Sequence, residues 1–145
     1  MAKEHVVDTT VLQKANAAIT EPPGRRSKFV RRLELLDQIQ AGEITVLFSK
    51  RLLTEYQTHV KRPRNDFVKL FFEVLDDPGR AVYNWAKWSG QERDNARRCR
   101  FPREDYHVLR TAIRPNATTI VTEEERMLKT DESLYRAFRV HVRDI

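Results

Sequence analysis

Short runs of β-branched residues alternate along this chain with longer segments of helical period, and that alternation constrains the fold more than any other feature. The runs are His5–Val7, Ile44–Phe48 and Thr118–Val121, followed by the alternating segment Val140–Val142. Such runs are typical of buried or half-buried strands. Strands separated by helices need crossover connections, which place helices on both faces of a mainly parallel sheet. The sequence therefore predicts an α/β fold, a three-layer α/β/α sandwich around a mainly parallel central sheet.

Between these runs, apolar residues recur with the 3.6-residue period of amphipathic helices. Thr122 followed by Glu125 predicts a capping box at the start of one helix, and Asp131 predicts the cap of the next. For Arg80–Arg103 the pattern predicts at least one helix. The other predicted helices are Thr9–Ile19, broken by Glu21–Gly24; Ser27–Gln40, closed by Gly42; one capped by Ser49 and ended by Pro63; Phe67–Val74; one from Pro102 through Ile113; one through Leu128; and one containing Leu134 and Phe138.

Length and composition narrow the class of protein. At 145 residues the sequence fits one domain, residues 1–145, with a core of its own. Lys and Arg number 27 against 21 Asp and Glu, and the net charge of +6 favours polyanions such as nucleic acid. A single cysteine, Cys99, excludes an internal disulfide and a cysteine-based zinc site. With no signal peptide and no run of ~20 apolar residues, we expect a cytoplasmic protein that does not enter membranes.

Acidic residues follow the predicted strands where a parallel sheet usually carries its site, at the carboxyl ends of the strands. Asp8 ends the first run, and Glu123 and Glu124 follow the third. Glu55 lies in the helix after the second run, and Asp105 lies beside the buried face of its own helix. We expect these carboxylates to converge, and carboxylate oxygens are the ligands that Mg²⁺ and Mn²⁺ prefer.

Most of these acids also have a structural explanation. Glu55 suits an exposed helix position, and Asp105 suits the positive end of its helix dipole. Glu123 and Glu124 suit a helix N-terminus for the same reason. Asp8, at the end of an apolar strand, is the hardest to explain by structure alone. The histidines show no metal-ligand spacing and are interpreted as surface or structural groups: His5, His59, His107 and His141.

Four segments resemble, in the right order along the chain, the acidic motifs of PIN-domain nucleases: Val6–Leu12, Leu53–Tyr56, Pro102–Tyr106 and Ile120–Glu124. The resemblance covers nearly the whole sequence. It implies a PIN-like fold and a cluster of catalytic carboxylates, which here are Asp8, Glu55, Asp105 and Glu124.

The resemblance also assigns roles within that cluster. It implies that Asp8, Asp105 and Glu124 hold Mg²⁺ or Mn²⁺, and that Glu55 completes the site or assists proton transfer. Thr9, Thr122 and Glu123 would be supporting residues, with Glu123 an alternative to Glu124 because the family more often has Asp at that position. Thr10 stands where Asn or Ser is common in the family, which predicts a looser orientation of Asp8.

The implied activity is hydrolysis of single-stranded RNA by a metal-dependent endoribonuclease. The small size is similar to that of VapC-like toxins of toxin–antitoxin pairs, which implies an antitoxin partner and a homodimer. The alternative is a catalytically impaired PIN-fold module that binds nucleic acid or acts as a scaffold.

A basic run precedes the predicted helix of Asp105. Arg97, Arg98 and Arg100 are expected to bind the RNA backbone, although such runs are often only solvated faces. Trp85 and Trp88 lie nearby and are either stacking platforms for bases or anchors of the core.

Overall fold

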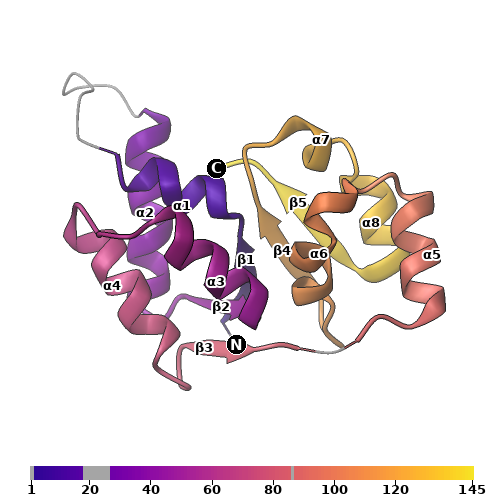
Figure 1. Cartoon of the computed structure of the whole chain (residues 1–145), viewed down its shortest axis with the longest axis horizontal. Helices are drawn as coiled ribbons and strands as arrows, with labels where there is room; N and C mark the ends of the chain where they lie inside the picture. Colours follow the sequence, from indigo (N-terminus) through magenta and orange to yellow (C-terminus); the bar gives the residue numbers. More distant parts are fainter. Residues whose placement is uncertain (1, 18–26, 86) are drawn as a thin grey trace.

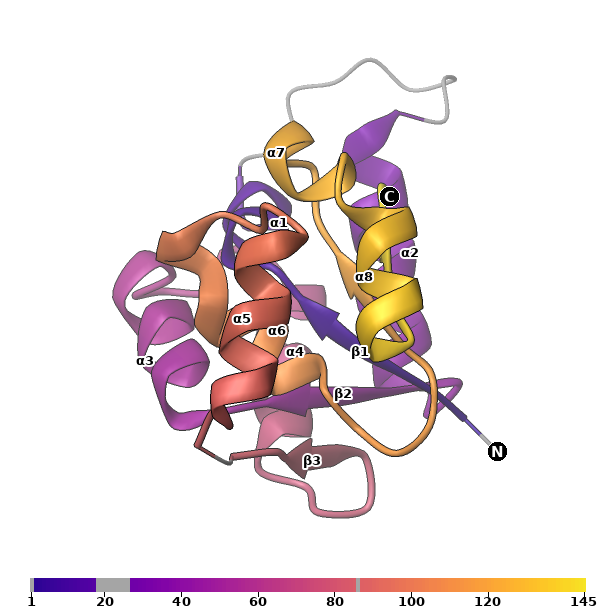
Figure 2. The ribbon, with the colours of Figure 1, turned by 90° about the vertical axis from the view of Figure 1, so that its right-hand side faces the viewer.

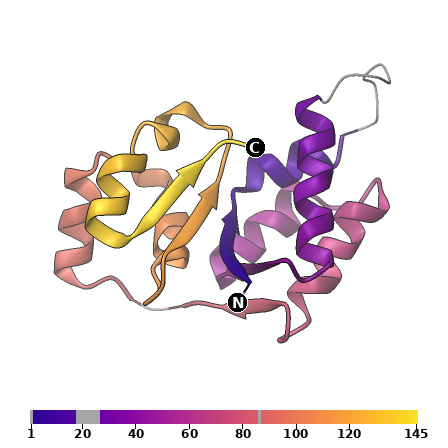
Figure 3. The same cartoon turned by 180° about the vertical axis from the view of Figure 1, so that it is seen from behind.

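Within the residues that the computed structural model describes, 2–17, 27–85 and 87–145, five strands form one parallel sheet (Figure 1). The strands are β1 (Lys3–Val7), β2 (Ile44–Phe48), β3 (Ala81–Tyr83), β4 (Thr118–Val121) and β5 (Val140–Arg143). Their order across the sheet is β3-β2-β1-β4-β5, and each neighbouring pair is parallel. Figure 3 shows β5, β4 and β1 in this order from behind. The predicted parallel α/β architecture is confirmed.

Helices cover the sheet on both sides and carry the chain from strand to strand. The helices are α1 (Thr9–Ala15), α2 (Lys28–Gln40), α3 (Lys50–His59), α4 (Asp66–Leu75), α5 (Gly90–Arg98), the 3₁₀ turn η1 (Arg103–Asp105), α6 (Tyr106–Ala112), α7 (Glu125–Leu128) and α8 (Asp131–Phe138). Helix α2 packs against β2 and α4, whereas α6 packs against β1, β2 and β4. Figure 2 shows α2 and α6 on opposite sides of β1. None of the described helices has the length and hydrophobicity needed to cross a bilayer.

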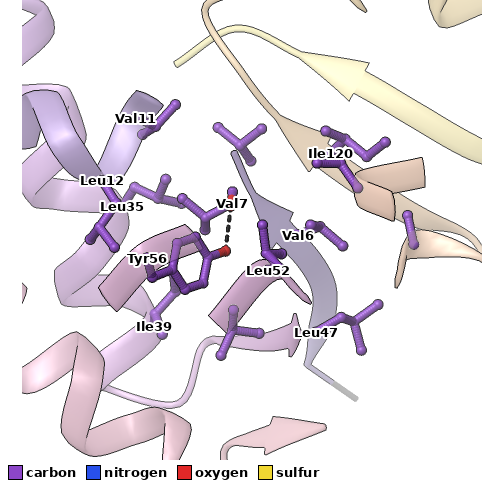
Figure 4. Packing of buried hydrophobic residues seen from close by; sticks show 14 of the residues in the cluster. Val6, Val7, Val11, Leu12, Leu35, Ile39, Leu47, Leu52, Tyr56 and Ile120 are labelled. Atoms are coloured by element: carbon purple, nitrogen blue, oxygen red, sulfur yellow. Dashed lines mark hydrogen bonds between the residues drawn. The ribbon is translucent and has the colours of Figure 1, made fainter. Parts of the chain in front are cut away.

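Tyr56 of α3 closes the core beneath the carboxyl end of β1. Its ring is fully buried and meets Phe71 edge to face, with ring centroids 5.5 Å apart. Its hydroxyl donates a hydrogen bond to the carbonyl of Val7, as Figure 4 shows. Burial raises the pKa of Tyr56 well above its ordinary value, and the charges of Asp8 and Glu55 act in the same direction. The neutral phenol of Tyr56 therefore fixes the backbone of Val7, the last residue of β1.

The segment Arg80–Arg103 contains the one strand that the sequence analysis does not predict. Strand β3 has three residues and pairs only with β2, so it is too short to show a clear alternation of side chains. The predicted helix in this segment is confirmed as α5. Ser89 accepts a hydrogen bond from the backbone N–H of Glu92, whose side chain accepts one in return, which forms a capping box.

Other predicted boundaries differ at the ends of helices. Helix α1 ends at Ala15, so its predicted continuation through Asn16 and Ala17 is wrong. The rest of the predicted extension, to Ile19, and the break at Glu21–Gly24 lie outside the described residues. The predicted cap at Asp131 is wrong because its carboxylate binds the next strand, where it accepts hydrogen bonds from the Val142 N–H and the Arg143 guanidinium. The predicted cap of α3 by Ser49 is confirmed, and Ser27 caps α2 in the same way.

Candidate active site

Asp8 follows β1 directly and is almost fully buried, with 5 % of its surface exposed. Its backbone N–H donates to the carbonyl of Val121, so the ends of β1 and β4 are joined just below the side chain. Carboxylate Oδ2 accepts hydrogen bonds from the hydroxyls of Thr10, at 2.9 Å, and Thr122, at 2.8 Å. The predicted loosening by Thr10 is wrong, because this hydroxyl reaches Asp8 and helps to orient it.

Thr122 links two acidic segments and does not cap a helix with its side chain. While its hydroxyl donates to Asp8, the same oxygen accepts a hydrogen bond from the backbone N–H of Glu124 at 3.0 Å. Helix α7 starts after Glu124 and has no side-chain cap. The predicted capping box with Glu125 is therefore wrong, since the Thr122 hydroxyl is fully buried and bound to Asp8. One threonine thus connects the ends of β1 and β4.

Glu55 projects from α3, where it accepts a hydrogen bond from one side chain and lies close to another. Its Oε2 accepts a hydrogen bond from the Thr9 hydroxyl at 3.1 Å, and its Oε1 lies 2.7 Å from Nε2 of His107. Thr9, predicted as a supporting residue, thus contacts Glu55. The predictions miss His107 as a neighbour of the acids. Its position two residues after Asp105, at the start of α6, was the signal that could have found it.

Asp105 brings the third acidic segment to the same place. Oxygen atoms of Asp105, Glu104 and Glu124 lie within 4.8 Å of one another. The pKa of Asp105 is raised to about 7, mainly by burial and next by the charge of Glu124. Smaller contributions in the same direction come from Asp8, Glu104 and Glu55. All four carboxylates named from the sequence therefore lie in one electrostatic environment.

Glu104 is an acidic member of this group that the predictions do not name. Its carboxylate lies 2.6 Å from the guanidinium of Arg126, which also lies 3.8 Å from Glu124. This hydrogen bond lowers the pKa of Glu104. Glu104 and Asp105 both lie in the η1 turn, and an oxygen of each lies within 4.8 Å of an oxygen of Glu124.

Glu123 pairs with an arginine outside the group around Asp105. Its two oxygens accept hydrogen bonds from Arg32 of α2 at 2.7 and 2.8 Å. Burial acts to raise the pKa of Glu123, but the hydrogen bonds and charge of Arg32 outweigh burial and lower it. The side chain is 4 % exposed. The structure thus places Glu124, and not Glu123, in the group around Asp105.

Three of the acids share a position in their local structure. Asp8, Asp105 and Glu124 are the N-cap residues of α1, α6 and α7, and none of them accepts a capping hydrogen bond with its side chain. An N-cap carboxylate commonly binds the free N–H groups of its helix. Here the carboxylates remain available for another ligand, while the positive ends of the helix dipoles still favour their charge.

The donor set fits a divalent cation of the hard class. Every ligand atom offered by Glu104, Asp105 and Glu124 is a carboxylate oxygen, the type that Mg²⁺ and Mn²⁺ prefer. The raised pKa of Asp105 shows that its negative charge is disfavoured by burial and by its neighbours. A bound cation removes that penalty because it favours the ionised form.

The three arginines predicted to bind RNA differ in their neighbours. Arg97 of α5 pairs with Asp94 at 2.8 Å. Arg98 and Arg100 instead line a shallow pocket beside α7, together with Arg126 and Lys129. Since Arg126 contacts Glu104 and Glu124, this second group borders the acidic cluster.

Comparison with known proteins identifies the family to which this arrangement corresponds. The family model for the PIN domain matches residues 5–126, which includes all the carboxylates described above. No curated protein and no solved structure gives a significant match.

Proposed function

Because the chain belongs to the PIN-domain family, whose members are generally nucleases that use divalent metal ions, we propose that it is a metal-dependent endoribonuclease that hydrolyses phosphodiester bonds of single-stranded RNA. The observation that carries the proposal is the group of carboxylates at the carboxyl end of the sheet. Within that group Asp105 has a pKa of about 7, and its neighbours are acids from three other segments. The formal net charge of +6 also favours a polyanionic substrate.

In this proposal Asp8, Asp105 and Glu124 hold Mg²⁺ or Mn²⁺, and Glu104 is an additional candidate donor. A bound divalent ion would lower the pKa of water and neutralise charge on the phosphate that is cleaved. Thr10 and Thr122 hold the carboxylate of Asp8 in one orientation. Asp8 thus has a fixed position before substrate binds, which avoids reorganisation during the reaction.

Glu55 is positioned for proton transfer. Its oxygens are held by Thr9 and lie next to His107, so it can accept the proton of an attacking water. The water oxygen attacks phosphorus, and the bond between phosphorus and the 3′ oxygen breaks. The products are a 5′-phosphate and a 3′-hydroxyl, in keeping with the end groups that the resemblance to PIN nucleases implies.

Purified protein tests this proposal with end-labelled single-stranded RNA. Cleavage is expected with Mg²⁺ or Mn²⁺ and should stop on chelation, and Asp8→Asn should abolish it. Asp37→Asn is a matched control, because Asp37 is an exposed acid of α2. Activity that survives exhaustive chelation overturns the metal mechanism. RNA binding without cleavage under any metal condition supports the alternative, a catalytically impaired binding module.

The toxin role, the antitoxin partner and the homodimer rest on the resemblance to VapC-like toxins. Under this proposal, induced expression of the wild-type chain in bacteria arrests growth, whereas Asp8→Asn does not. Light scattering of the purified protein measures the oligomeric state. Equal growth with both chains contradicts the toxin role and leaves the nuclease proposal standing.

A further inference from the structure

A basic pocket of about 650 Å³ lies beside the acidic cluster, between the start of α3, the connection from β3 to α5, and α6. This volume is within the range of sites for small organic ligands. No carboxylate is among the described residues that line it. Its five lining cations are Lys50, Arg51, Lys87, Arg93 and Arg110. The ligand that suits such a lining is an anion.

Arg110 is the cation that most needs a partner. Its Nε and Nη1 atoms are buried, and neither has a hydrogen-bond acceptor within the described part of the chain. Two neighbouring polar groups are already engaged: Asn84 donates to the backbone carbonyl of Thr111, whose hydroxyl binds Ser49. Burying two N–H groups of a half-buried guanidinium without acceptors is costly, and a phosphate oxygen in the pocket is an acceptor of the right charge.

Both tryptophans of the sequence line the same pocket. Trp88 is partly buried and packs at a tilt against Tyr106, with ring centroids 5.7 Å apart, so it has the core contact expected of an anchor. Trp85 is 63 % exposed, which is unusual for so large an apolar surface. An exposed indole beside cations is a platform on which a nucleobase can stack.

The pocket adjoins the acidic cluster at His107. His107 lines the pocket, and its Nε2 lies 2.7 Å from the carboxylate of Glu55. Helix α3 presents Lys50 and Thr54 to the pocket and Glu55 to the cluster. A strand cleaved at the carboxylates therefore has an adjacent cationic and aromatic surface to occupy.

We propose that this pocket binds a nucleotide of the single-stranded substrate next to the cleaved bond. Trp85 stacks on the base, and Arg110 together with the exposed cations holds the phosphate. The identity of the strand as RNA rests on the proposed function. The assignment of the pocket as a binding site rests on the unpaired guanidinium N–H groups, the exposed indole and the absence of acids from its described lining.

Intrinsic fluorescence reports on this pocket directly, because both tryptophans line it. Titration of the full chain with a short single-stranded RNA, in chelator to prevent cleavage, should quench the emission to saturation. Trp85→Leu and Arg110→Gln should each weaken binding about tenfold, measured by anisotropy of labelled RNA. Phe67→Leu and Lys69→Gln change an exposed aromatic residue and an exposed cation of α4 that do not line the pocket, and both should bind as wild type does.

The outcomes separate this inference from the proposed function. Wild-type affinity in both pocket variants, with cleavage intact, overturns the pocket and leaves the nuclease standing. Quenching and loss of binding in the variants, with no cleavage by wild type, supports the pocket and contradicts the nuclease. If Arg110→Gln fails to fold, the exposed Arg93→Gln takes its place. Saturable quenching by polyglutamate but not by RNA overturns the assignment to a nucleotide.

Discussion

The acidic cluster has two halves that differ in how their carboxylates are held. Asp8 and Glu55 form the inner half, and each accepts a hydrogen bond from at least one threonine hydroxyl. Asp105, Glu104 and Glu124 form the outer half, where oxygens of the three acids lie within 4.8 Å of one another. Among the described residues, the cation that pairs with acids of the outer half is the exposed Arg126.

This difference corresponds to two requirements of a metal site, namely oriented ligands and an excess of negative charge. The inner half has its orientation determined before any ligand arrives, because α1 and the residue after β4 place the threonine donors around Asp8 and Glu55. The outer half carries an excess of negative charge, because three acids from η1 and from the start of α7 crowd together beside the cation Arg126. Changes in the inner half should therefore act through geometry, and changes in the outer half through charge.

The largest expected effect comes from removing one carboxylate from each half. Asp8→Asn and Asp105→Asn should each lower kcat/KM by about 10³-fold or more, and the double variant should lose little beyond either single variant. Residues that act as one unit are not additive, because the second change removes a group that has already lost its role. Cleavage rates in saturating Mn²⁺ measure this. Losses that multiply would show that the two halves work independently.

The next effect tests the hydroxyls that orient the inner half. Thr122→Val should lower kcat/KM by about 10- to 100-fold, because a neighbour that orients a metal ligand usually contributes that much. Thr122→Ser should restore most of the activity, since a serine hydroxyl can make the same hydrogen bond. Full activity in Thr122→Val would mean that the hydrogen bond at 2.8 Å does not govern Asp8.

Features that depend on local pattern could be predicted from the sequence. The apolar runs separated by helical segments predicted the parallel sheet, and the acid that ends the first run predicted the position of Asp8. Ser49 was correctly predicted as a cap because capping depends on residues only a few positions apart. The three-residue β3 was missed because it is too short for its pattern to stand out.

Contacts between distant residues could not be predicted in this way. Thr122 and Glu125 have the spacing of a capping box, yet the hydroxyl serves Asp8, which is 114 positions away. The sequence left both Glu123 and Glu124 as candidates for the fourth acid. In the structure Arg32, 91 positions from Glu123, pairs with Glu123. In each case the sequence pattern is present, but the side chain interacts with a residue that is distant in sequence and close in the folded structure.

The pH dependence of stability tests the outer half. The pKa of Asp105 is about 7 in the folded protein against an ordinary 3.8, so the folded state binds this proton more tightly than the unfolded chain. The resulting stability is fully present below about pH 4 and is lost as the pH rises through about 7. At about pH 8, Asp105→Asn should therefore melt above wild type, since it lacks the ionised carboxylate.

The size of this effect is modest because Asp105 is only half-buried. After solvent screening, Asp105→Asn is expected to raise the free energy of unfolding at about pH 8 by about 1 kcal/mol. For a chain of this length that raises Tm by about 4 °C. Near pH 4 the two proteins should melt together, within about 1 °C. Mn²⁺ at about pH 8 should raise the Tm of wild type more than that of the variant. Equal melting at both pH values would contradict the crowding of charge around Asp105.

The smallest expected effect concerns the cations that border the outer half. Arg98 and Arg100 share a shallow pocket with Arg126, whereas Arg97 is paired with Asp94. If the RNA backbone crosses from the acidic cluster onto this pocket, Arg98→Gln/Arg100→Gln should flatten the dependence of binding on salt. The slope of log K against log salt should fall by about 0.7 for each phosphate of a single strand that the variant no longer binds.

Arg97→Gln is the matched control on the same helix end. Its guanidinium pairs with Asp94 and does not line the pocket of Arg98 and Arg100, so its removal should change the slope by less than the double variant does. Binding measured in Ca²⁺ at several salt concentrations separates the two, and Mn²⁺ stabilisation should be unchanged in both because every acid remains. Equal slopes in all three proteins would mean that the strand leaves the outer half by another route. The basic pocket beside the inner half, with Arg110 and Trp85, would then be the surface that carries the substrate.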